Sequence, residues 1–509
     1  MSGLIGSPRT FRSAARIALV MAAAGTMTFL PVAQGLARGL GGGFGSHGMR
    51  MPGGEGRFPG GDGPRYPGGG GGPRFPGGGG VIMLPPGGYG PGNPVVIVDD
   101  GDLPRRARKL AKKQKQQKQQ KQLAQRGGFN APPAGERRFV PNEVLLNVSA
   151  ALSQPAFDAI TRRYRLTRLE TQDFALTRRR LARVRINDGR PVATVIRSLQ
   201  AEARLLGAQP NYLYVVQQSG APSAADPAQY SLAKLRLPEA HALAKGASAL
   251  VAVIDTAIDA SHPDLAGVLA SSFDATGAAD KPHPHGTGIA SVIAAHGKLT
   301  GAAPAVKLLA VHAFGSARSE GTSMNILKGL DWAGTSKANV VNMSFAGPAD
   351  PELHTMLAAL RGKGAVLVAA AGNAGPNSRP LYPAADPEVI AVTATDANDR
   401  LFAQANRGTH IAVAAPGVDI LAAAPNGSYQ LQSGTSFAAA QVSGIAALLR
   451  DRNPALDAAA VRRILMSTAH DLGAPGHDEQ FGSGLADAFG AVTAAEPKPS
   501  EVSAAPVSH

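Results

Sequence analysis

The chain contains no cysteine among its 509 residues. Disulfide bonds and cysteine-bound zinc are therefore excluded. Aromatic residues are also scarce, at 5% with a single tryptophan, whereas hydrophobic residues reach 44%. The core must be built mainly from aliphatic and small side chains, and the length allows two or three domains of about 150 residues each.

The C-terminal half of the chain has no excess of positive charge. The formal net charge is +15, yet residues 230–495 carry 18 Lys and Arg against 21 Asp and Glu. Residues 1–229 carry 32 against 13, so all of the excess lies there. Since the C-terminal half lacks a basic excess, we do not expect nucleic acid as a partner.

The N-terminus has the pattern of an export signal. Three arginines precede residues 17–37, which carry no charge and are rich in Ala and Gly. This favours a signal peptide over residues 1–37, with the mature protein in the periplasm, at the cell surface or in the medium. An uncleaved membrane anchor is the alternative, because the span is just long enough to cross a bilayer.

Two segments of biased composition follow. Residues 38–103 are rich in Gly and Pro, with the loose repeat RFPGG, RYPGG, RFPGGG. Such a segment cannot bury enough apolar surface to offset its chain entropy, so we expect it to be disordered. Residues 104–136 begin with ten Lys and Arg and no acid in 104–126. We interpret them as a solvated linker; weak attraction to an anionic surface is the alternative.

A small α+β unit is predicted over residues 137–217. Alternating or apolar runs indicate strands at 143–148, 168–176, 180–186 and 211–217. Helical spacing indicates helices at 155–164 and 191–206. The order βαββαβ predicts an antiparallel sheet with two helices. The next segment, 218–229, is rich in small and turn-forming residues, so we expect an exposed linker.

From residue 230 the pattern becomes α/β. Short, nearly all-apolar runs are typical of parallel strands buried on both faces, and helical stretches lie between several of them. This predicts a doubly wound, mostly parallel sheet with helices on both faces, whose functional groups gather at the carboxyl ends of the strands. The runs are 249–255, 307–313, 339–345, 365–372, 389–395 and 411–417.

Four chemically capable residues lie at such ends or at helix starts. Asp255 closes a strand, His285 precedes a helix expected to start near Gly286, and Asn373 ends the run AAAGN. Ser436 opens a helix, where backbone N–H donors are free. Each has an ordinary structural interpretation alone, as a turn former or a helix cap. Together they provide an acid, a base, an amide donor and a nucleophile in one domain.

The segments VAVIDTAIDASHPDL, HGTGIASVI, AAAGNAGP and SGTSFAAAQVSG resemble the motifs of subtilisin-like serine peptidases, the subtilases. The order Asp, His, Ser is that of subtilisin. The resemblance covers about residues 226–490 and implies a subtilisin-like fold over a peptidase domain of residues 230–492. It further implies an Asp255–His285–Ser436 triad with Asn373 as an oxyanion donor. The substrate-binding residues implied are Ser344, Phe345, Ala346, Gly347, Ala371 and Gly372.

The resemblance gives the N-terminal half a role. Unit 137–217 resembles the inhibitory prodomain of the family, and its last strand would lie in the cleft until self-cleavage within 217–229. We expect an exported endopeptidase, monomeric, acting on proteins or peptides and held as a zymogen, with residues 493–509 as a disordered tail. Structural calcium is common in the family, but no cofactor site is assignable here. The alternatives are an inert, protease-like surface binding protein and a triad esterase.

Some positions depart from the family pattern. Ala257 replaces the Gly of the Asp-Thr-Gly motif, and Gly288 replaces the second His of His-Gly-Thr-His. After the serine, Phe437 replaces Met, while Ala440 and Gln441 replace Pro-His. No departure removes a nucleophile, base or acid, so we expect the chemistry to be retained and the local packing to differ.

Overall fold

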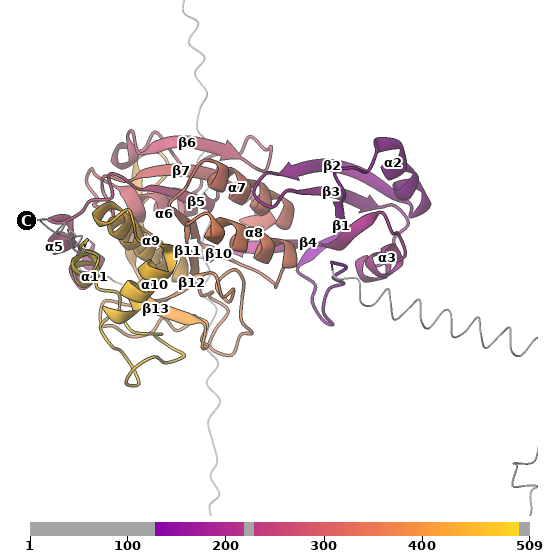
Figure 1. Ribbon diagram of the computed structural model, residues 1–509. Coiled ribbons are helices and arrows are strands. Elements are labelled where there is room, and N and C mark those ends of the chain that lie inside the picture. The colour runs from indigo at the N-terminus through magenta and orange to yellow at the C-terminus, as the bar shows by residue number, and fades with distance from the viewer. Residues whose placement is uncertain (1–127, 218–228, 498–509) are drawn as a thin grey trace, which may run out of the picture. The chain divides into compact units, whose positions relative to one another are not determined.

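The computed structural model describes residues 128–217 and 229–497 (Figure 1). The predicted signal peptide or anchor, the Gly/Pro-rich segment, residues 104–127 of the basic linker and residues 218–228 lie outside the described residues, as do residues 498–509. Within the described residues, no helix combines the length and apolarity needed to cross a membrane.

The first unit has the predicted order βαββαβ. Its strands are β1 (Phe139–Val148), β2 (Leu166–Phe174), β3 (Arg179–Ile186) and β4 (Leu205–Val216), and its helices are α2 (Gln154–Arg163) and α3 (Val192–Leu199). The strands pair antiparallel in the order β4-β1-β3-β2. Aliphatic side chains of both helices and of the sheet form one core, and the N-terminal Phe129, bridged to Ala208, joins it.

The second helix of this unit is shorter than the sequence pattern predicts. Helix α3 ends at Leu199, and the segment expected to continue it to residue 206 instead enters strand β4 at Leu205. Residues Leu205 to Pro210 pair with β1, from Val148 back to Val144. The helical prediction for 200–206 is wrong because these pairings override the helix propensity of AEARLL.

The second unit contains a parallel sheet of seven strands. Their order is β13-β12-β11-β9-β5-β7-β6, and every pairing is parallel. The strands are β5 (Leu250–Asp255), β6 (Leu269–Asp274), β7 (Lys307–His312), β9 (Val340–Met343), β11 (Val366–Ala370), β12 (Ile390–Thr395) and β13 (Ile411–Pro416). All six predicted apolar runs form these strands; β6 was missed because at the sheet edge most of its side chains are exposed or half-buried.

Alternate side chains of β5 show why the runs are apolar throughout. Val251 and Val253 join the core that contains α6 and α9, whereas Ala252 and Ile254 join the core that contains α7 and α8. Both faces of the sheet are thus buried under helices, as predicted for a doubly wound fold (Figure 1). The helices are α4 (Tyr230–Lys234), α5 (Leu237–His241), α6 (Pro284–Ala294), α7 (Ser323–Thr335), α8 (Pro351–Gly362), α9 (Thr435–Arg452), α10 (Ala458–Ser467) and α11 (Ala488–Ala494), with a 3-10 turn at Pro263–Leu265.

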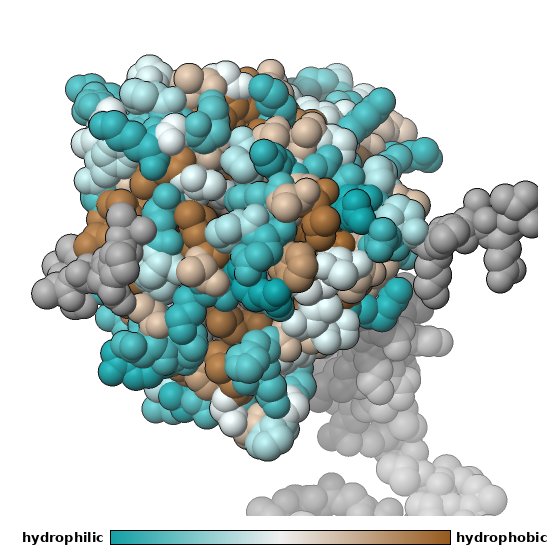
Figure 2. Space-filling model, turned by 90° about the vertical axis from the view of Figure 1, so that its left-hand side faces the viewer, coloured by the Kyte–Doolittle hydropathy of each residue, from teal (hydrophilic) through white to brown (hydrophobic). Residues whose placement is uncertain are grey.

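Four short strands complete the unit. β14 (Ile420–Ala424) and β15 (Ser428–Gln432) form a hairpin whose turn places Asn426 and Gly427 at positive φ. β8 (Glu320–Thr322) and β10 (Phe345–Ala346) each pair antiparallel with the end of β4. The last strand of the first unit is therefore hydrogen-bonded on both sides to the second unit. The face beside α5 and α11 is mostly hydrophilic, with hydrophobic residues in separate small groups (Figure 2).

Two helical glycines provide a test of this packing. In α9, a Cβ on Gly444 would lie 2.5 Å from the Cβ of Ala302, whereas a Cβ on Gly362 in α8 would meet nothing within 4 Å. We expect Gly444→Ala to lower the free energy of unfolding by about 1–3 kcal/mol. Gly362→Ala should leave it unchanged or raise it by up to about 1 kcal/mol. Thermal unfolding in a Ser436→Ala background measures both; a Gly444→Ala protein as stable as its parent would contradict the packing.

Candidate active site

A buried carboxylate and a buried imidazole meet at the carboxyl end of β5. Asp255 ends that strand, and its Oδ1 lies 2.7 Å from Nδ1 of His285, with both side chains fully buried. The neighbouring Thr256 donates from its backbone N–H (2.7 Å) and its hydroxyl (3.1 Å) to the same oxygen. Because Nδ1 faces the carboxylate, the other ring nitrogen of His285 is directed away from Asp255.

His285 is held in the first turn of α6. The helix begins at Pro284, slightly before the expected start near Gly286. The side chain of His283 accepts the backbone N–H of His285, and Thr256 Oγ1 accepts the N–H of Gly286 at 3.0 Å. Gly286 is required here, since a Cβ would collide with the backbone of Thr256. Burial and the neighbouring His285 lower the pKa of His283, so this cap is neutral near pH 7.

Ser436 is the second residue of α9 and is fully buried. Its Oγ donates to the carbonyl oxygen of Ser344 at 2.9 Å. Within residues 128–217 and 229–497, Nε2 of His285 has no hydrogen-bond partner. The adjacent Phe437 ring contacts the imidazole of His285, with ring centres 5.8 Å apart. The structure therefore brings Asp255 and His285 into contact, but it shows Ser436 bonded to Ser344 rather than to His285.

Asn373 follows β11 and faces the start of α9. Its Oδ1 accepts from the backbone N–H (3.1 Å) and the hydroxyl (2.8 Å) of Thr435. These two donors fix the orientation of the amide and leave Nδ2 directed toward Gly434, at 3.0 Å from where a Cβ on that glycine would lie. Asn406 supports the same loop by accepting the N–H of Ala374 at 2.9 Å.

The end of β4 lies across these groups. Val216 pairs with Phe345, and Val215 pairs with Ala346 on one side and with Glu320 on the other. The N–H of Gln217 donates to the carbonyl of Ser344 at 3.1 Å. The carbonyl oxygen of Gln217 lies against Gly434, where a Cβ would collide with it. The cleft is thus occupied by an extended segment of the chain itself.

The six residues expected to bind substrate divide into two groups. Ser344, Phe345 and Ala346 bond to the segment, and Gly347 packs on the ring of Tyr214. Ala371 and Gly372 pack behind Asn373 instead: the N–H of Ala371 donates to Val392, and that of Gly372 donates to Thr435 Oγ1 at 3.1 Å.

A cavity of about 670 Å³ adjoins Gln217 on one side of the segment. Its lining includes Ala346, Asn373, Ala374, Ser378, Leu381 and Gln404. Of these residues, Ala346 and Asn373 belong to the segments that resemble the subtilase motifs, and the others come from the chain that follows Asn373. Among the described residues, no three His, Asp or Glu side chains converge to hold a metal ion.

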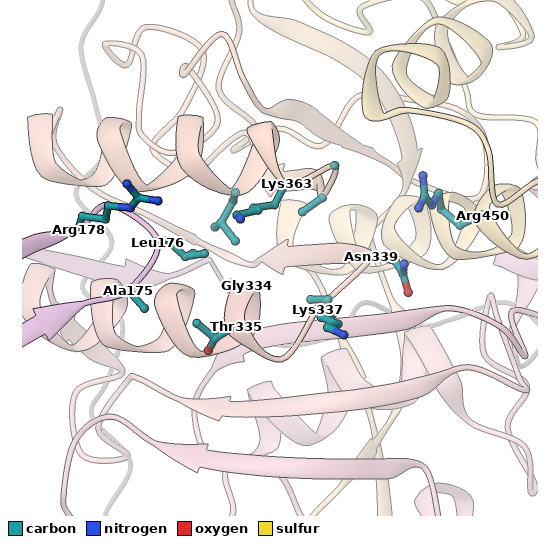
Figure 3. Close-up of a pocket in the computed structure, with 13 residues that line it drawn as sticks. Ala175, Leu176, Arg178, Gly334, Thr335, Lys337, Asn339, Lys363 and Arg450 are labelled. Atoms are coloured by element: carbon teal, nitrogen blue, oxygen red, sulfur yellow. The ribbon is translucent and has the colours of Figure 1, made fainter.

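A second cavity, of about 650 Å³, lies near the amino ends of β9 and β11, and its lining includes neither Asp255 nor Asn373. Figure 3 shows the residues around it. Lys337 and Lys363 follow the ends of α7 and α8, where a positive charge stabilises the helix dipole. Arg178 and Arg450 lie at its two other sides. The residues that line it belong to none of the groups at the carboxyl ends of the strands.

Comparisons with known proteins identify the family of this chain. Residues 246–484 match the model of the subtilase family, peptidase S8. The chain is 35% identical over 286 residues to subtilisin E of Bacillus subtilis, covering 54% of this chain and 74% of that protein. It is 34% identical over 272 residues to thermitase of Thermoactinomyces vulgaris, covering 52% of this chain and 95% of that protein. The chain belongs to the subtilase family.

A solved structure shows the same fold. Fervidolysin from Fervidobacterium pennivorans, described as a keratinolytic enzyme related to subtilisin, aligns with a TM-score of 0.61 at 22% identity. The alignment covers 72% of this chain and 63% of that one. The predicted subtilisin-like fold is thereby confirmed, and membership of the subtilase family makes this protein a serine endopeptidase that acts on proteins or peptides.

Several residues of this subtilase site were not predicted. Thr256 follows Asp255 and Thr435 precedes Ser436 in the chain. Their hydroxyl groups next to the predicted residues could have suggested a supporting role. A buried chain of hydrogen bonds was not readable: Ser443 Oγ donates to Asn342, Asn342 donates to Ser344 Oγ, and Ser344 Oγ donates to the carbonyl of Ser436. Its members come from separate segments, and only the fold brings them together.

The departures from the subtilase pattern at positions 288 and 257 have local explanations. A Cβ on Gly288 would lie 2.6 Å from the amide nitrogen of Gln432 and 3.3 Å from the ring of Phe437. The space of the usual second histidine is therefore filled by these two side chains. Ala257 lies outside the positive-φ region, so a glycine is not required there.

Restoring the family residue at position 288 should therefore be unfavourable. We expect Gly288→His to lower the free energy of unfolding by about 1–3 kcal/mol, because the imidazole would displace both Gln432 and Phe437. Gly288→Ala should cost less, since the flexible Gln432 amide alone has to move. Thermal melts of the two variants measure the difference; a Gly288→His protein more stable than Gly288→Ala would contradict this packing.

Proposed function

We propose that Asp255, His285 and Ser436 are the catalytic triad of this endopeptidase and that residues 137–217 are its intramolecular inhibitor. We further propose that the bond after Gln217 is the one cut during maturation. One observation carries this proposal: the segment ending at Gln217 occupies the cleft as a substrate would. Its N–H bonds to Ser344, and its carbonyl oxygen lies against Gly434 beside Asn373.

The backbone pairing explains how a peptide is aligned. Strand β4 enters between β8 and β10, so a bound chain gains main-chain hydrogen bonds on both edges. Such pairing supplies affinity for any extended sequence, and side-chain pockets add selectivity. A protein substrate would take the same place once the inhibitor has left.

The chemistry follows from the groups at the carbonyl of Gln217 or of the matching substrate residue. Ser436 Oγ leaves Ser344, rotates toward Nε2 of His285, transfers its proton there and attacks the carbonyl carbon. The negative charge on the carbonyl oxygen is stabilised by Nδ2 of Asn373 and the N–H of Ser436. Asp255 keeps the imidazole in the required tautomer and stabilises the imidazolium.

The intermediate then collapses. The carbon–nitrogen bond breaks as the imidazolium gives its proton to the leaving amine, and the acyl group stays on Ser436. Water, deprotonated by His285, attacks the ester, and the proton returns to Ser436 as the acid product departs. The observed Ser436–Ser344 bond is replaced in the first step by a bond to Nε2 of His285, which accepts no hydrogen bond from any described residue.

Contacts outside the cleft support an inhibitory role for the first unit. Its β2–β3 turn donates the N–H groups of Ala175 and Leu176 to the carboxylate of Asp331 in α7, at 3.1 and 2.8 Å. Arg179 pairs with Glu352 in α8 at 2.7 Å. These contacts hold the unit over two helices, so that β4 is delivered to the cleft in one register.

The proposal also includes that the protein is exported and that it acts as a monomer. The three arginines and the uncharged segment 17–37 support export, as does the resemblance to the prodomain of a zymogen. A self-inhibited form would keep the enzyme inactive until it reaches its destination.

Loss of the nucleophile tests the proposal directly. We expect wild-type protein made by cell-free translation to hydrolyse casein and to yield a product whose N-terminus is Gln218, by intact mass. Ser436→Ala should stay full length and inactive, because no other group can form the acyl intermediate. Ser467→Ala, at the end of α10, is the matched control and should behave as wild type. Cleavage after Gln217 in Ser436→Ala, or a different N-terminus in wild type, would overturn the corresponding assignment.

The amide of Asn373 gives a second test. Asn373→Ala should lower kcat by about 10²–10³, the loss measured for such a donor in a subtilisin, with little change in KM. Thr435→Val keeps the size of the side chain but removes one of the two donors that orient Asn373. We expect a smaller loss, about tenfold in kcat, because the backbone N–H still holds Oδ1. A full loss in Thr435→Val, or none in Asn373→Ala, would argue against this donor.

A further inference from the structure

The cavity of about 650 Å³ near the amino ends of β9 and β11 is lined by both units of the protein (Figure 3). The β2–β3 turn of the first unit contributes Leu176 and Arg178, and the second unit contributes the ends of α7 and α8. A Cβ on Gly364, which lines the cavity after α8, would meet nothing within 4 Å. The volume falls within the range of about 300–1,000 Å³ that is usual for small-molecule sites. The cavity is therefore large enough to hold a small molecule.

The charged side chains that line this cavity are all positive. They are Arg178 of the first unit and Lys337, Lys363 and Arg450 of the second. No Asp or Glu is among the described residues of the lining. Within residues 128–217 and 229–497, none of these four side chains forms an ion pair. Arg450 donates to the carbonyl oxygen of Leu456, but its buried Nε has no partner in the described part of the chain.

The helix ends at the cavity offset only part of this charge. Helices α7 and α8 both end here, and the C-terminus of a helix acts as about half a negative charge. Two such ends cancel about one of the four positive charges and leave about three. Docking of the first unit brings Arg178 to the three cations of the second unit, and like charges repel. An anion between the two units would turn this repulsion into attraction.

Two of the four cations stand where the backbone does not favour a long side chain. Arg178 has a φ of 54° and Lys337 a φ of 62°, in the left-handed region that Gly and Asn adopt most readily. Lys337 is the second residue after the end of α7, a position at which glycine is common. The backbone therefore gives no reason for Arg or Lys at these two positions, whereas the binding of an anion does.

We propose that this cavity binds a small compound with several linked phosphate groups, which bridges Arg178 of the first unit to the three cations of the peptidase. Arginine presents paired N–H donors that match phosphate oxygens, and lysine adds a compact charge. Because each phosphate carries up to about two negative charges near neutral pH, linked phosphates can neutralise a site of about three positive charges. The bound compound would delay release of the first unit after cleavage. This effect on release rests on the proposed function, whereas the binding itself does not.

Binding is tested with tripolyphosphate on the full-length Ser436→Ala protein, so that self-cleavage does not occur during calorimetry. We expect a saturable site of one tripolyphosphate per chain. Arg178→Gln and Lys363→Gln should each weaken it at least about tenfold, the effect of one hydrogen bond between charged groups. Because residues 104–126 carry ten Lys and Arg and also attract phosphates, the comparison between variants identifies the cavity.

Two matched controls remove a positive charge elsewhere. Arg168→Gln changes an exposed residue of β2, and Lys298→Gln changes an exposed residue that lies over the ring of Tyr429. Neither residue lines the cavity, so both variants should bind tripolyphosphate as the parent does. Sodium sulfate at the same ionic strength measures the contribution of charge screening and should not reproduce the binding.

The effect on release is measured with wild-type protein that is desalted after cell-free translation and diluted into casein. We expect tripolyphosphate to slow the appearance of casein hydrolysis about tenfold, because the bridge adds a charged hydrogen bond that must break before the first unit leaves. In Arg178→Gln the rate should not respond to tripolyphosphate, since the compound then contacts the peptidase alone. Arg168→Gln should respond as wild type does.

The possible results have distinct meanings. Equal affinity of Arg178→Gln, Lys363→Gln and the two controls overturns the site, and so does equal binding of sulfate. Loss of affinity in the two site variants without any effect of tripolyphosphate on release overturns the bridging role. If wild type neither cuts itself nor hydrolyses casein, the proposed function fails and the effect on release fails with it, while the calorimetry on Ser436→Ala still decides the site.

Discussion

The site depends on the register of three parallel strands. Ile254 of β5, Met343 of β9 and Ala369 of β11 lie in one row across the sheet. The chain positions that follow this row therefore emerge together at one edge, which brings Asp255 beside Ser344 and directs the loop of Asn373 toward the same place. If any of these strands shifted by one residue, the polar residue at its carboxyl end would point into a core that is apolar on both faces of the sheet. Hydrophobic packing thus fixes the positions of polar groups that would be costly to bury elsewhere.

Helix α9 adds the last element to that edge. It is buried from Thr435 to Leu449, so its start cannot move without disturbing the core. The peptide oxygen of Ser344 accepts both the hydroxyl of Ser436 and the N–H of Gln217, which links the state of the serine to the presence of a chain in the cleft. The buried chain of hydrogen bonds from Ser443 through Asn342 ties the helix to β9 from below. Rigid positioning of this kind is what an oxyanion-stabilising site needs.

The sequence allowed much of this to be predicted, for identifiable reasons. The strands of the large sheet were predicted because burial on both faces makes each an apolar run with clear ends. Asp255, His285, Asn373 and Ser436 were selected as candidates because they follow such runs or begin helices within recognisable motifs. Strand β6 was missed, since at an edge it lacks that signature, and residues 200–206 were assigned to a helix because their pairing partner lies more than 50 residues away in β1. The hydrogen bonds from Thr435 that orient Asn373, and the bond from Ala374 to Asn406, depend on contacts between distant segments that no local pattern records.

Strand β4 is at once a core strand of a small domain and the segment that fills the cleft. Its residues 205–210 pair with β1, while residues 213–216 pair with β8 and β10. Cutting the chain after Gln217 would leave this shared strand intact. Release of residues 213–217 from the cleft is therefore coupled to the stability of the domain that contains β4. If the cleaved domain is only partly folded by itself, its apparent affinity for the peptidase falls in proportion to its folded fraction, because only the folded form can bind. The folding equilibrium of these roughly 80 residues would then set the delay between cleavage and activity. Substitutions in the core of the small domain would change that delay although they lie far from any reacting atom.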